Sequence, residues 1–400
     1  MINTASIEAA RKRIRDRVYL SPCAYSETLS RMTGCRLYLK LENLQMTGSF
    51  KDRGALNRIL QLSEAEKKAG VIAASAGNHA QGVANAARLI GVRAVIVMPE
   101  TTPLSKIRGT QELGAEIVLH GMGYDDAFAR ALELADQRGL ALIHAFDDAE
   151  IIAGQGTIGL ELLEQVPELD KVIVPVGGGG LIAGIATAVK ARRPEVEIVG
   201  VEVERIPGMQ QSLAAGKVVA APTAGTIADG IAVGKVGALT LPVVQALVND
   251  VVAVSEEQIS GAIMTLLERE KTLAEGAGAA GFAALLAELV GEVGGRQVVV
   301  VISGGNIDMN LLGRIVERGL EADGRLARMT VVVADKPGSI ADLAAIVADE
   351  SANIFDITQS RWLSEVKLGE RQVVLELETR GADHAAAIRE AIRRGGFKMG

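Results

Sequence analysis

Short apolar runs alternate with amphipathic segments along most of this 400-residue chain, and no other feature restricts its fold as much. One series of runs occupies residues 71–74, 93–98 and 116–119. A second series occupies residues 171–176, 197–202, 251–254 and 297–302. Continuous apolar strands separated by helices are typical of parallel sheets that are covered on both faces. We therefore predict two parallel-sheet α/β subdomains, the smaller formed by about residues 45–145 and inserted in the larger.

The pattern changes near the C-terminal end of the chain. Residues 311–326 are charged and interrupted by glycines, which indicates a linker, and we place the first domain at residues 1–320 and the linker itself at residues 321–326. Residues 327–400 then show the order strand, helix, strand, strand, helix. This order is typical of a ferredoxin-like domain, so we expect a small separate domain there.

Composition restricts the kind of partner. Hydrophobic residues make up 48% and charged residues 23% of the chain, as in globular proteins, and the net charge of −7 argues against nucleic-acid or anionic-membrane partners. Cys23 and Cys35 form no CxxC motif and indicate neither a disulfide framework nor a metal site. Because no run has the length of a membrane span and the N-terminal segment lacks a signal-peptide core, we expect a cytoplasmic protein.

One lysine stands in unusual surroundings. Lys51 follows Phe50 and lies between Gly48 and Gly54, in the segment Met46-Thr-Gly-Ser-Phe-Lys-Asp-Arg-Gly54. An ε-amine forms a Schiff base with an aldehyde only when it is neutral, and a partly apolar pocket favours the neutral form. The alternative is a solvated lysine at a junction between loop and helix.

Four consecutive glycines, Gly177–Gly180, connect a buried strand with a helix. Their backbone N–H groups converge at the positive end of the helix and allow a phosphate to approach closely. The alternatives are a tight turn or a dinucleotide site, because Gly178-x-Gly180-x-x-Ala183 with Glu202 on the next strand fits the fingerprint of NAD-dependent oxidoreductases.

Two further loops follow apolar strands. Ser75-Ala-Gly-Asn-His-Ala-Gln-Gly82 predicts a second anion cradle, suited to a carboxylate, with Asn78 as a hydrogen-bond donor. Its histidine, His79, is either a general base or a structural hydrogen-bonding group. In Ser303-Gly-Gly-Asn-Ile-Asp308 the serine is placed to bond a ring nitrogen, unless the segment is an ordinary glycine turn.

The motifs occur together and in order: Gly48-Ser-Phe-Lys51, the segment 75–82, Ala153-Gly-Gln-Gly-Thr157, Gly177–Gly180, Glu275-Gly-Ala-Gly278 and Ser303-Gly-Gly-Asn306. Over about residues 5–320 the set resembles the threonine dehydratase (threonine ammonia-lyase) and serine dehydratase group of fold-type II pyridoxal-phosphate enzymes. NAD binding does not explain the sequences of the Lys51 and Asn78 loops, so we favour the dehydratase resemblance over an NAD-dependent oxidoreductase.

The resemblance implies a role for each motif. Lys51 would hold pyridoxal phosphate covalently and later take the Cα proton of the substrate, with Phe50 beside it in the cofactor site. Asn78 would donate a hydrogen bond to the ring oxygen, and Ser303 would face the pyridine nitrogen. The phosphate would be bound by Gly177, Gly178, Gly179, Gly180 and Leu181. The substrate carboxylate would be surrounded by Ser75, Ala76, Gly77 and His79, and no residue is assigned to a metal.

The implied reaction is a β-elimination. A serine opposite the ring nitrogen does not keep that nitrogen protonated, so the ring is a weaker electron sink and elimination is favoured over transamination. The resemblance implies a carbon–nitrogen lyase that converts L-threonine to 2-oxobutanoate and ammonia, with L-serine as a secondary substrate. A dehydratase for L-serine or 3-hydroxyaspartate stays open, as does a non-catalytic amino-acid sensor, although the intact lysine loop argues against a sensor.

The related serine racemases differ at two places. They carry a second serine where this chain has Ala76, and their metal cluster pairs a glutamate, matched by Glu202, with an aspartate where this chain has Gly208. We therefore expect neither racemisation nor a divalent metal. Within residues 144–149 this chain differs from the dehydratases, which often carry prolines there. We interpret Asp147 and Asp148 of this segment as turn and cap residues.

The segment from about residue 327 resembles an ACT domain, through Asp335-Lys-Pro-Gly338, the helix running to Ala348, and Ala352-Asn-Ile354. In that family an amino acid binds near the first turn, at an interface between paired domains. Allosteric amino-acid binding and a purely oligomerising role both stay open, as do a role in isoleucine biosynthesis and one in threonine degradation. The resemblance implies a homotetramer or homodimer.

Overall fold

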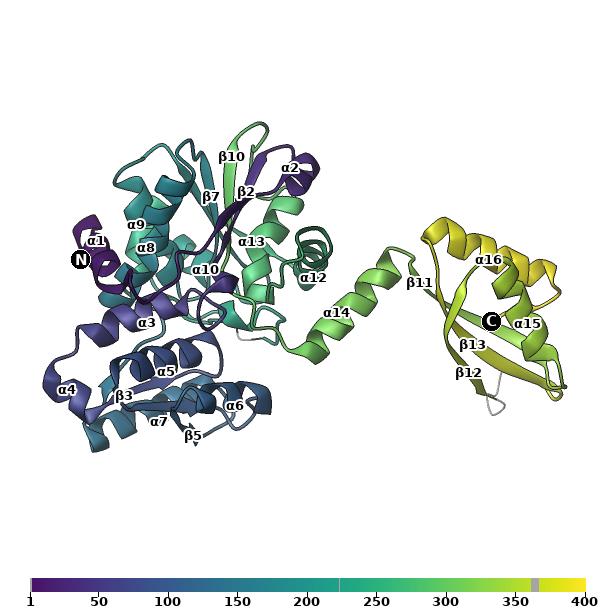
Figure 1. Cartoon of the computed structure of the whole chain (residues 1–400), viewed down its shortest axis with the longest axis horizontal. Helices are drawn as coiled ribbons and strands as arrows, with labels where there is room; N and C mark the ends of the chain where they lie inside the picture. Colours follow the sequence, from purple (N-terminus) through teal and green to yellow (C-terminus); the bar gives the residue numbers. More distant parts are fainter. Residues whose placement is uncertain (1, 223, 361–366) are drawn as a thin grey trace. The chain divides into compact units, whose positions relative to one another are not determined.

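The computed structural model of the chain describes residues 2–222, 224–360 and 367–400. The chain forms two compact units, residues 1–307 and 308–400 (Figure 1). Among the described residues, no helix has the length and apolar character needed to cross a bilayer.

The larger sheet of the first unit has six strands. Its order is β1 (Cys23–Tyr25), β2 (Arg36–Leu41), β10 (Gln297–Ile302), β7 (Lys171–Pro175), β8 (Glu197–Val203) and β9 (Asp250–Val254). All neighbours are parallel except β1 and β2. The run from Val298 to Ile302 has no exposed side chain, because helices cover both faces of the sheet. This confirms the predicted second parallel sheet.

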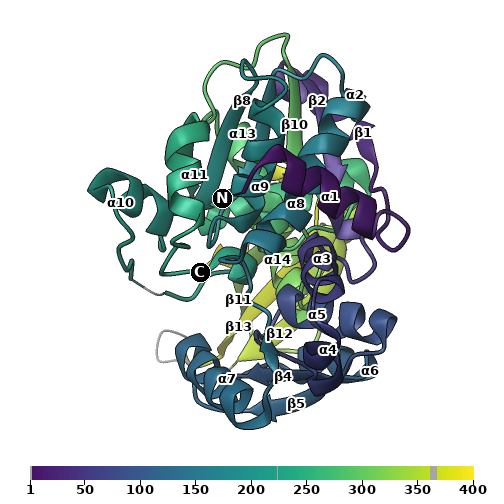
Figure 2. The same cartoon turned by 90° about the vertical axis from the view of Figure 1, so that its left-hand side faces the viewer.

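Helices pack on both faces of this sheet. Figures 1 and 2 show α8 (Ala149–Gln165) and α9 (Gly180–Lys190) on one face, whereas α12 (Glu256–Thr265) and α13 (Gly276–Leu286) lie on the other. The remaining helices of this part are α1 (Thr4–Ile14), α2 (Glu27–Thr33), α10 (Gly208–Ala215) and α11 (Thr240–Leu247). Two short 3₁₀-helices, η1 (Glu42–Leu44) and η2 (Asp229–Ile231), and a π-helical segment, η3 (Leu266–Glu270), complete it.

The smaller sheet is four-stranded and parallel throughout. Its order is β5 (Glu116–Leu119), β4 (Ala94–Met98), β3 (Val71–Ala74) and β6 (Ala141–Leu142). Its helices are α3 (Lys51–Leu60), α4 (Glu64–Ala69), α5 (Asn78–Ile90), α6 (Leu104–Glu112) and α7 (Tyr124–Arg138). Alternate strand residues face opposite ways: Val71 and Ala73 pack against α3 and α5, while Ile72 and Ala74 pack against α7. The predicted smaller subdomain is therefore present.

The second unit begins with a helix rather than a flexible linker. Residues Met309–Ala322 form α14, which Asp308 caps by accepting hydrogen bonds from Asn310 N and Leu311 N. The prediction of a linker here was wrong. Glycines and charged residues interrupt the helical pattern of this segment, in which Ile315 is the buried residue. The boundary between the compact units accordingly falls after residue 307 and not at residue 320.

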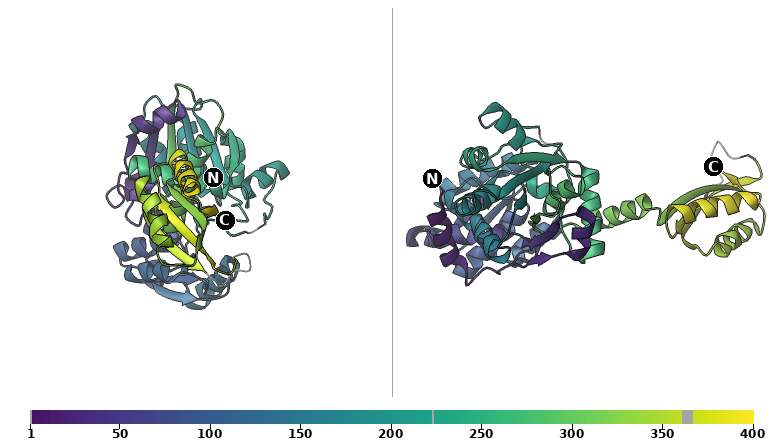
Figure 3. Two further views of the ribbon diagram at one scale, coloured as in Figure 1. Left: turned by 90° about the vertical axis from the view of Figure 1, so that its right-hand side faces the viewer. Right: turned by 90° about the horizontal axis from the view of Figure 1, so that it is seen from above.

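The rest of the second unit is a ferredoxin-like sandwich. Its antiparallel sheet has the order β12 (Asn353–Ser360), β13 (Glu370–Glu378), β11 (Leu326–Ala334) and β14 (Lys398–Met399). Helices α15 (Ser339–Asp349) and α16 (Ala382–Arg394) cover one face (Figure 3). Along β11, Met329, Val331 and Val333 point into this core at every second position. The predicted ferredoxin-like fold is confirmed.

Candidate active site

A cavity of about 850 Å³ lies at the carboxyl ends of the strands of the first unit, a common place for a ligand in open α/β sheets. Every site residue that the sequence pointed to lines it: Phe50, Lys51, Ser75, Ala76, Gly77, Asn78, His79, Gly177, Gly178, Gly179, Gly180, Leu181 and Ser303. Residues from four separate loops are thus brought together around one cavity.

Lys51 is the first residue of α3 and points its amine at the cavity wall. Its Nζ donates a hydrogen bond to the Ala145 carbonyl at 2.8 Å and lies 5.1 Å from the centre of the Phe50 ring. Burial lowers the pKa of Lys51 to about 8, although the Glu275 carboxylate acts in the opposite direction. A substantial fraction of the amine is therefore neutral in mildly alkaline solution, as covalent chemistry requires.

The loop before Lys51 is held by its own polar groups. Asp52 accepts hydrogen bonds from the backbone N and the Oγ1 of Thr47 at 2.8 and 2.9 Å. Gly48 has a φ of +75°, a left-handed conformation that favours glycine. The Phe50 N–H donates to the Ser303 carbonyl at 3.1 Å, which fastens this loop to the end of β10.

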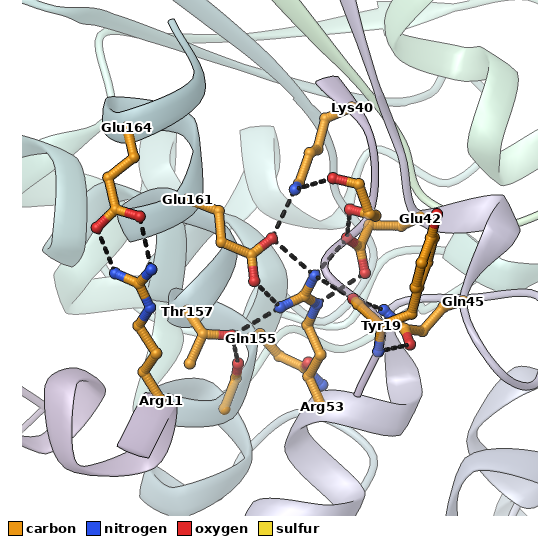
Figure 4. Close-up of polar contacts among 12 residues, drawn as sticks. Arg11, Tyr19, Lys40, Glu42, Gln45, Arg53, Gln155, Thr157, Glu161 and Glu164 are labelled. Carbon is orange, nitrogen blue, oxygen red and sulfur yellow. Dashed lines mark hydrogen bonds and ion pairs between the residues drawn. The ribbon is translucent and has the colours of Figure 1, made fainter. Parts of the chain in front are cut away.

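A group of buried charges lies behind the same helix (Figure 4). Arg53, two residues after Lys51, donates to Glu42 and Glu161, and Lys40 Nζ donates to Glu161 at 2.5 Å. These four residues, here called the Arg53 cluster, carry balanced charge. They join α3 to β2 and α8, so the helix that carries Lys51 is attached to the larger subdomain.

The glycine quartet is shaped by its neighbours. Gly179, with a φ of +91°, is the N-cap of α9. A side chain at Gly178 would overlap the ring of Phe146, so only glycine fits that position. Thr240 Oγ1 donates to the Gly178 carbonyl at 2.7 Å and fixes the turn. The loop therefore offers backbone N–H groups at a helix start, where an anion is stabilised.

Glu202 does not take part in this site. Its carboxylate accepts hydrogen bonds from Met209 N at 2.9 Å and Gln210 N at 3.0 Å, at the start of α10. It is absent from the cavity lining, so it is not placed to bind the ribose of a dinucleotide. In the parts of the chain that the structure describes, no group of three or more His, Cys, Asp or Glu side chains could hold a metal ion.

The loop that starts α5 presents backbone rather than side-chain donors. Gly77 is the N-cap and provides no side chain, and Ser75 Oγ accepts a hydrogen bond from Gly77 N at 3.1 Å. The His79 ring is buried against the Ile143 carbonyl at 2.9 Å, and burial, reinforced by nearby Lys51, lowers the pKa of His79 to about 3. The ring is therefore neutral and has a structural hydrogen-bonding role, one of the two roles that the sequence left open.

Several lining residues were not predicted. Phe146, Gln155 and Glu275 line the cavity, and so do Lys106 of α6 and Asp229 of η2, which form an ion pair. Glu275 belongs to one of the sequence motifs, but the sequence indicated no function for it. The Lys106–Asp229 ion pair joins distant segments, so no local pattern could indicate it. Asp148 is the N-cap of α8, as predicted, since it accepts hydrogen bonds from Glu150 N and Ile151 N. Asp147 instead accepts hydrogen bonds from Ala238 N and Leu239 N, just before α11 and 91 and 92 residues away in the sequence.

Comparison with known proteins agrees with this geometry. Residues 14–304 match the family described as pyridoxal-phosphate dependent enzyme. The chain is 47% identical over 399 residues to an L-threonine ammonia-lyase of Thermotoga maritima, covering 100% of this chain and 99% of that protein. An L-threonine ammonia-lyase of Geobacter sulfurreducens is 46% identical, with coverage of 96% and 95%. The processed form of threonine deaminase isoform 2 from Solanum lycopersicum superposes with a TM-score of 0.75 at 41% identity, with coverage of 78% and 91%.

The cavity fits this cofactor. A buried amine with a lowered pKa faces it, a glycine cradle leaves room for a phosphate where a side chain at Gly178 would overlap Phe146, and the amide of Asn78 lies at its wall. The chain therefore belongs to the family of pyridoxal-phosphate-dependent enzymes.

Proposed function

We propose that this protein is an L-threonine ammonia-lyase with L-serine as a secondary substrate. It eliminates water from L-threonine, and the resulting enamine tautomerises and is hydrolysed by one water to 2-oxobutanoate and ammonia. The observation that carries the proposal is the full-length match to an L-threonine ammonia-lyase at 47% identity. The cavity contributes an independent argument, because it combines a reactive amine with two anion cradles.

The lining of the cavity supports a set of residues that would hold the cofactor. Pyridoxal phosphate, when bound, withdraws electrons from the substrate Cα through its ring. Lys51 would supply the covalent attachment, and Ser303 would face the ring nitrogen without protonating it. The backbone N–H groups of Gly177–Gly180 and Leu181 would hold the phosphate, and Asn78 would donate to the ring oxygen.

Lys51 also moves the proton. Its neutral amine accepts the proton of the substrate Cα, and the lowered pKa makes this form accessible in mildly alkaline solution. The loop of residues 75–79 orients the substrate carboxylate at the start of α5. Ala76 has no hydroxyl group with which to return a proton to the other face of the substrate, so elimination is favoured over racemisation.

The charges around the cavity favour a small uncharged side chain. Asp229 and Glu275 both line it, and Lys106 is already paired with Asp229. A substrate with an acidic side chain, such as 3-hydroxyaspartate, would meet carboxylates there rather than an available cation on α6. L-Threonine and L-serine carry no such charge.

The proposal is tested by measuring 2-oxo acid release from L-threonine, L-serine and 3-hydroxyaspartate. We expect a yellow protein in which borohydride fixes the cofactor on Lys51, and the highest kcat/KM for L-threonine. A colourless protein, or one that releases no 2-oxo acid from any hydroxy amino acid, would contradict it. A preference for L-serine would shift the assignment to the serine dehydratases.

We also propose that the second unit is an ACT domain that regulates the enzyme, in a cytoplasmic homo-oligomer. Its ferredoxin-like topology and the turn Asp335–Gly338 before α15 support this. An amino-acid effector would bind near that turn. Activity and molar mass in solution, each measured with and without isoleucine, distinguish an effector site from a purely oligomerising module.

A further inference from the structure

The side-chain amide of Asn78 is held from two sides. Asn78 Nδ2 donates to Glu275 Oε1 at 2.6 Å, and Asn78 Oδ1 accepts from Asn306 Nδ2 at 2.8 Å. Asn306 Nδ2 also donates to the Thr47 carbonyl at 2.7 Å. These residues come from four separate segments of the chain, so the arrangement results from the fold and not from local sequence.

The contacts determine which way the amide faces. The Thr47 carbonyl can only accept a hydrogen bond, so the nitrogen of the Asn306 amide must lie on that side. Both Nδ2 hydrogens of Asn306 are then used, and the atom of Asn78 that faces them must be the oxygen. One Nδ2 hydrogen of Asn78 goes to Glu275, which leaves the second for the cavity that Asn78 lines.

We propose that Asn306 and Glu275 are positioning residues, which hold the Asn78 amide with one N–H available to the ring oxygen of the cofactor. This inference rests on the proposed function, in which Asn78 binds that oxygen. An amide without these two contacts would present its oxygen equally well, and two oxygens facing each other repel.

Neighbouring glycines make room for both positioning residues. A side chain at Gly48 would meet the amide of Asn306, and one at Gly304 would overlap the carboxylate of Glu275. Gly304 also pairs with Ser49 through backbone hydrogen bonds in an isolated bridge. The glycines of two motifs thus serve the orientation of Asn78 as well as the turns in which they lie.

Glu275 lies among several charges. Burial raises the pKa of Glu275 to about 7, Asp229 acts in the same direction, and Asn78 and Lys106 oppose it. The Glu275 carboxylate also raises the pKa of the Lys51 amine, although burial of that amine has the larger, opposite effect. Removing the charge of Glu275 should therefore change the titration of Lys51 as well as the acceptor for Asn78.

The main test compares Asn306→Asp with Asn306→Ala in the holoenzyme, read by the absorption spectrum without substrate. The carboxylate introduced by Asn306→Asp would only accept hydrogen bonds, so Asn78 would turn its nitrogen toward it and present oxygen to the cofactor. We expect Asn306→Asp to lose the long-wavelength absorption band of the bound cofactor and to have a kcat at least about tenfold lower, the scale of one lost hydrogen bond to a charged group. Asn306→Ala should show a smaller loss of this band and a smaller fall in kcat. If Asn306→Ala perturbs the band as much as Asn306→Asp does, or if Asn306→Asp leaves it intact, the proposal is overturned.

The second test uses Glu275→Gln, with Glu202→Gln as the matched control. Both glutamates are buried, and burial raises the pKa of each to about 7, but Glu202 caps α10 away from the cavity. In the cofactor-free full chain, labelling of Lys51 by acetic anhydride should have its pH midpoint below about 8 in Glu275→Gln and unchanged in Glu202→Gln. The positioning role itself is read from Glu275→Leu, which removes the acceptor for Asn78: its holoenzyme should lose the long-wavelength absorption band, whereas Glu202→Leu should keep it. A band that stays intact in Glu275→Leu would overturn the part assigned to Glu275, even if Asn306→Asp does not fold.

These readouts separate the inference from the proposed function. If the wild-type protein binds the cofactor and shows the expected spectral changes but does not turn over L-threonine, the proposed function fails while the positioning role stands. If L-threonine is turned over and the spectra of the variants match the wild type, the positioning role fails alone.

Discussion

Lys51 and Arg53 lie two residues apart on α3, yet their surroundings are opposite. Lys51 reaches the cavity and donates to a neutral carbonyl, and burial lowers its pKa to about 8. Arg53 is fully buried between Glu42 and Glu161, and these carboxylates outweigh the effect of burial and raise its pKa. One turn of helix therefore carries both a reactive amine and an inert guanidinium cation. Whether a buried cation has bonded carboxylates decides whether it serves chemistry or stability.

Lys51→Ala should produce the largest effect of these substitutions. It should lower catalytic activity and leave the stability of the fold nearly unchanged. We expect kcat to fall by about a thousandfold or more, because the covalent attachment and the proton acceptor are lost together. Thermal unfolding of the cofactor-free protein should hardly change, since the hydrogen bond that is lost is a single one to the Ala145 carbonyl. A variant that unfolds at much lower temperature would contradict the contrast with Arg53.

Arg53→Met should have the reverse effect and destabilise the fold. Removing Arg53 leaves the buried Glu42 without its ion-pair partner and Glu161 with Lys40 alone, at a cost of about 3–5 kcal/mol in the free energy of unfolding. Arg11→Met is the matched control, because the Arg11–Glu164 pair is partly exposed and its loss should cost about 0–1 kcal/mol. Urea unfolding of the cofactor-free proteins measures the loss of unfolding free energy in both variants. Equal losses in Arg53→Met and Arg11→Met would show that burial does not determine the cost.

The pH dependence of Lys51 sharpens the comparison further. A lowered pKa means that the amine loses its proton as the pH rises through about 8, whereas ordinary lysines do so near about 10.4. Acetic anhydride labelling of the cofactor-free protein, read by mass spectrometry, should show Lys51 half-reactive at about pH 8. A midpoint equal to that of surface lysines would show that the cavity does not desolvate the amine.

Gly178→Ala should have a smaller effect, limited to cofactor binding. The added methyl group would overlap the Phe146 ring and displace the phosphate cradle, so we expect about tenfold weaker cofactor binding, the equivalent of about 1.4 kcal/mol. Gly109→Ala, in α6, is the control: nothing lies within 4 Å of its added methyl group. It should stabilise the protein by about 0.5–1 kcal/mol, measured by thermal unfolding. Normal cofactor binding in Gly178→Ala would show that the ring of Phe146 moves aside.

Much of the fold could be predicted because it is encoded locally. Buried parallel strands read as continuous apolar runs, and the loops after them carry glycines wherever a backbone must approach a ligand. The cavity was predictable for the same reason, since each of its motifs directly follows a strand or starts a helix. The Lys51 loop, the α5 start and the α9 start all belong to this class.

The remaining features depend on contacts between distant segments. No local pattern indicates that Arg53 points into the protein, because its partners are 11 and 108 residues away. The same holds for the contact of Glu275 with Asn78, 197 residues apart. Helix α14 was missed for another reason: Gly313 and Gly319 lie within it and imitate a linker.

The balanced charges of the Arg53 cluster also restrict how this sequence can change over time. Each of its members neutralises another, so a substitution at one position alone leaves a charge without a counterpart inside the protein. Exchanging the whole set for apolar side chains of similar volume avoids that penalty. Descendants of this chain should therefore either retain all four residues or replace them in concert, and intermediate combinations should be rare.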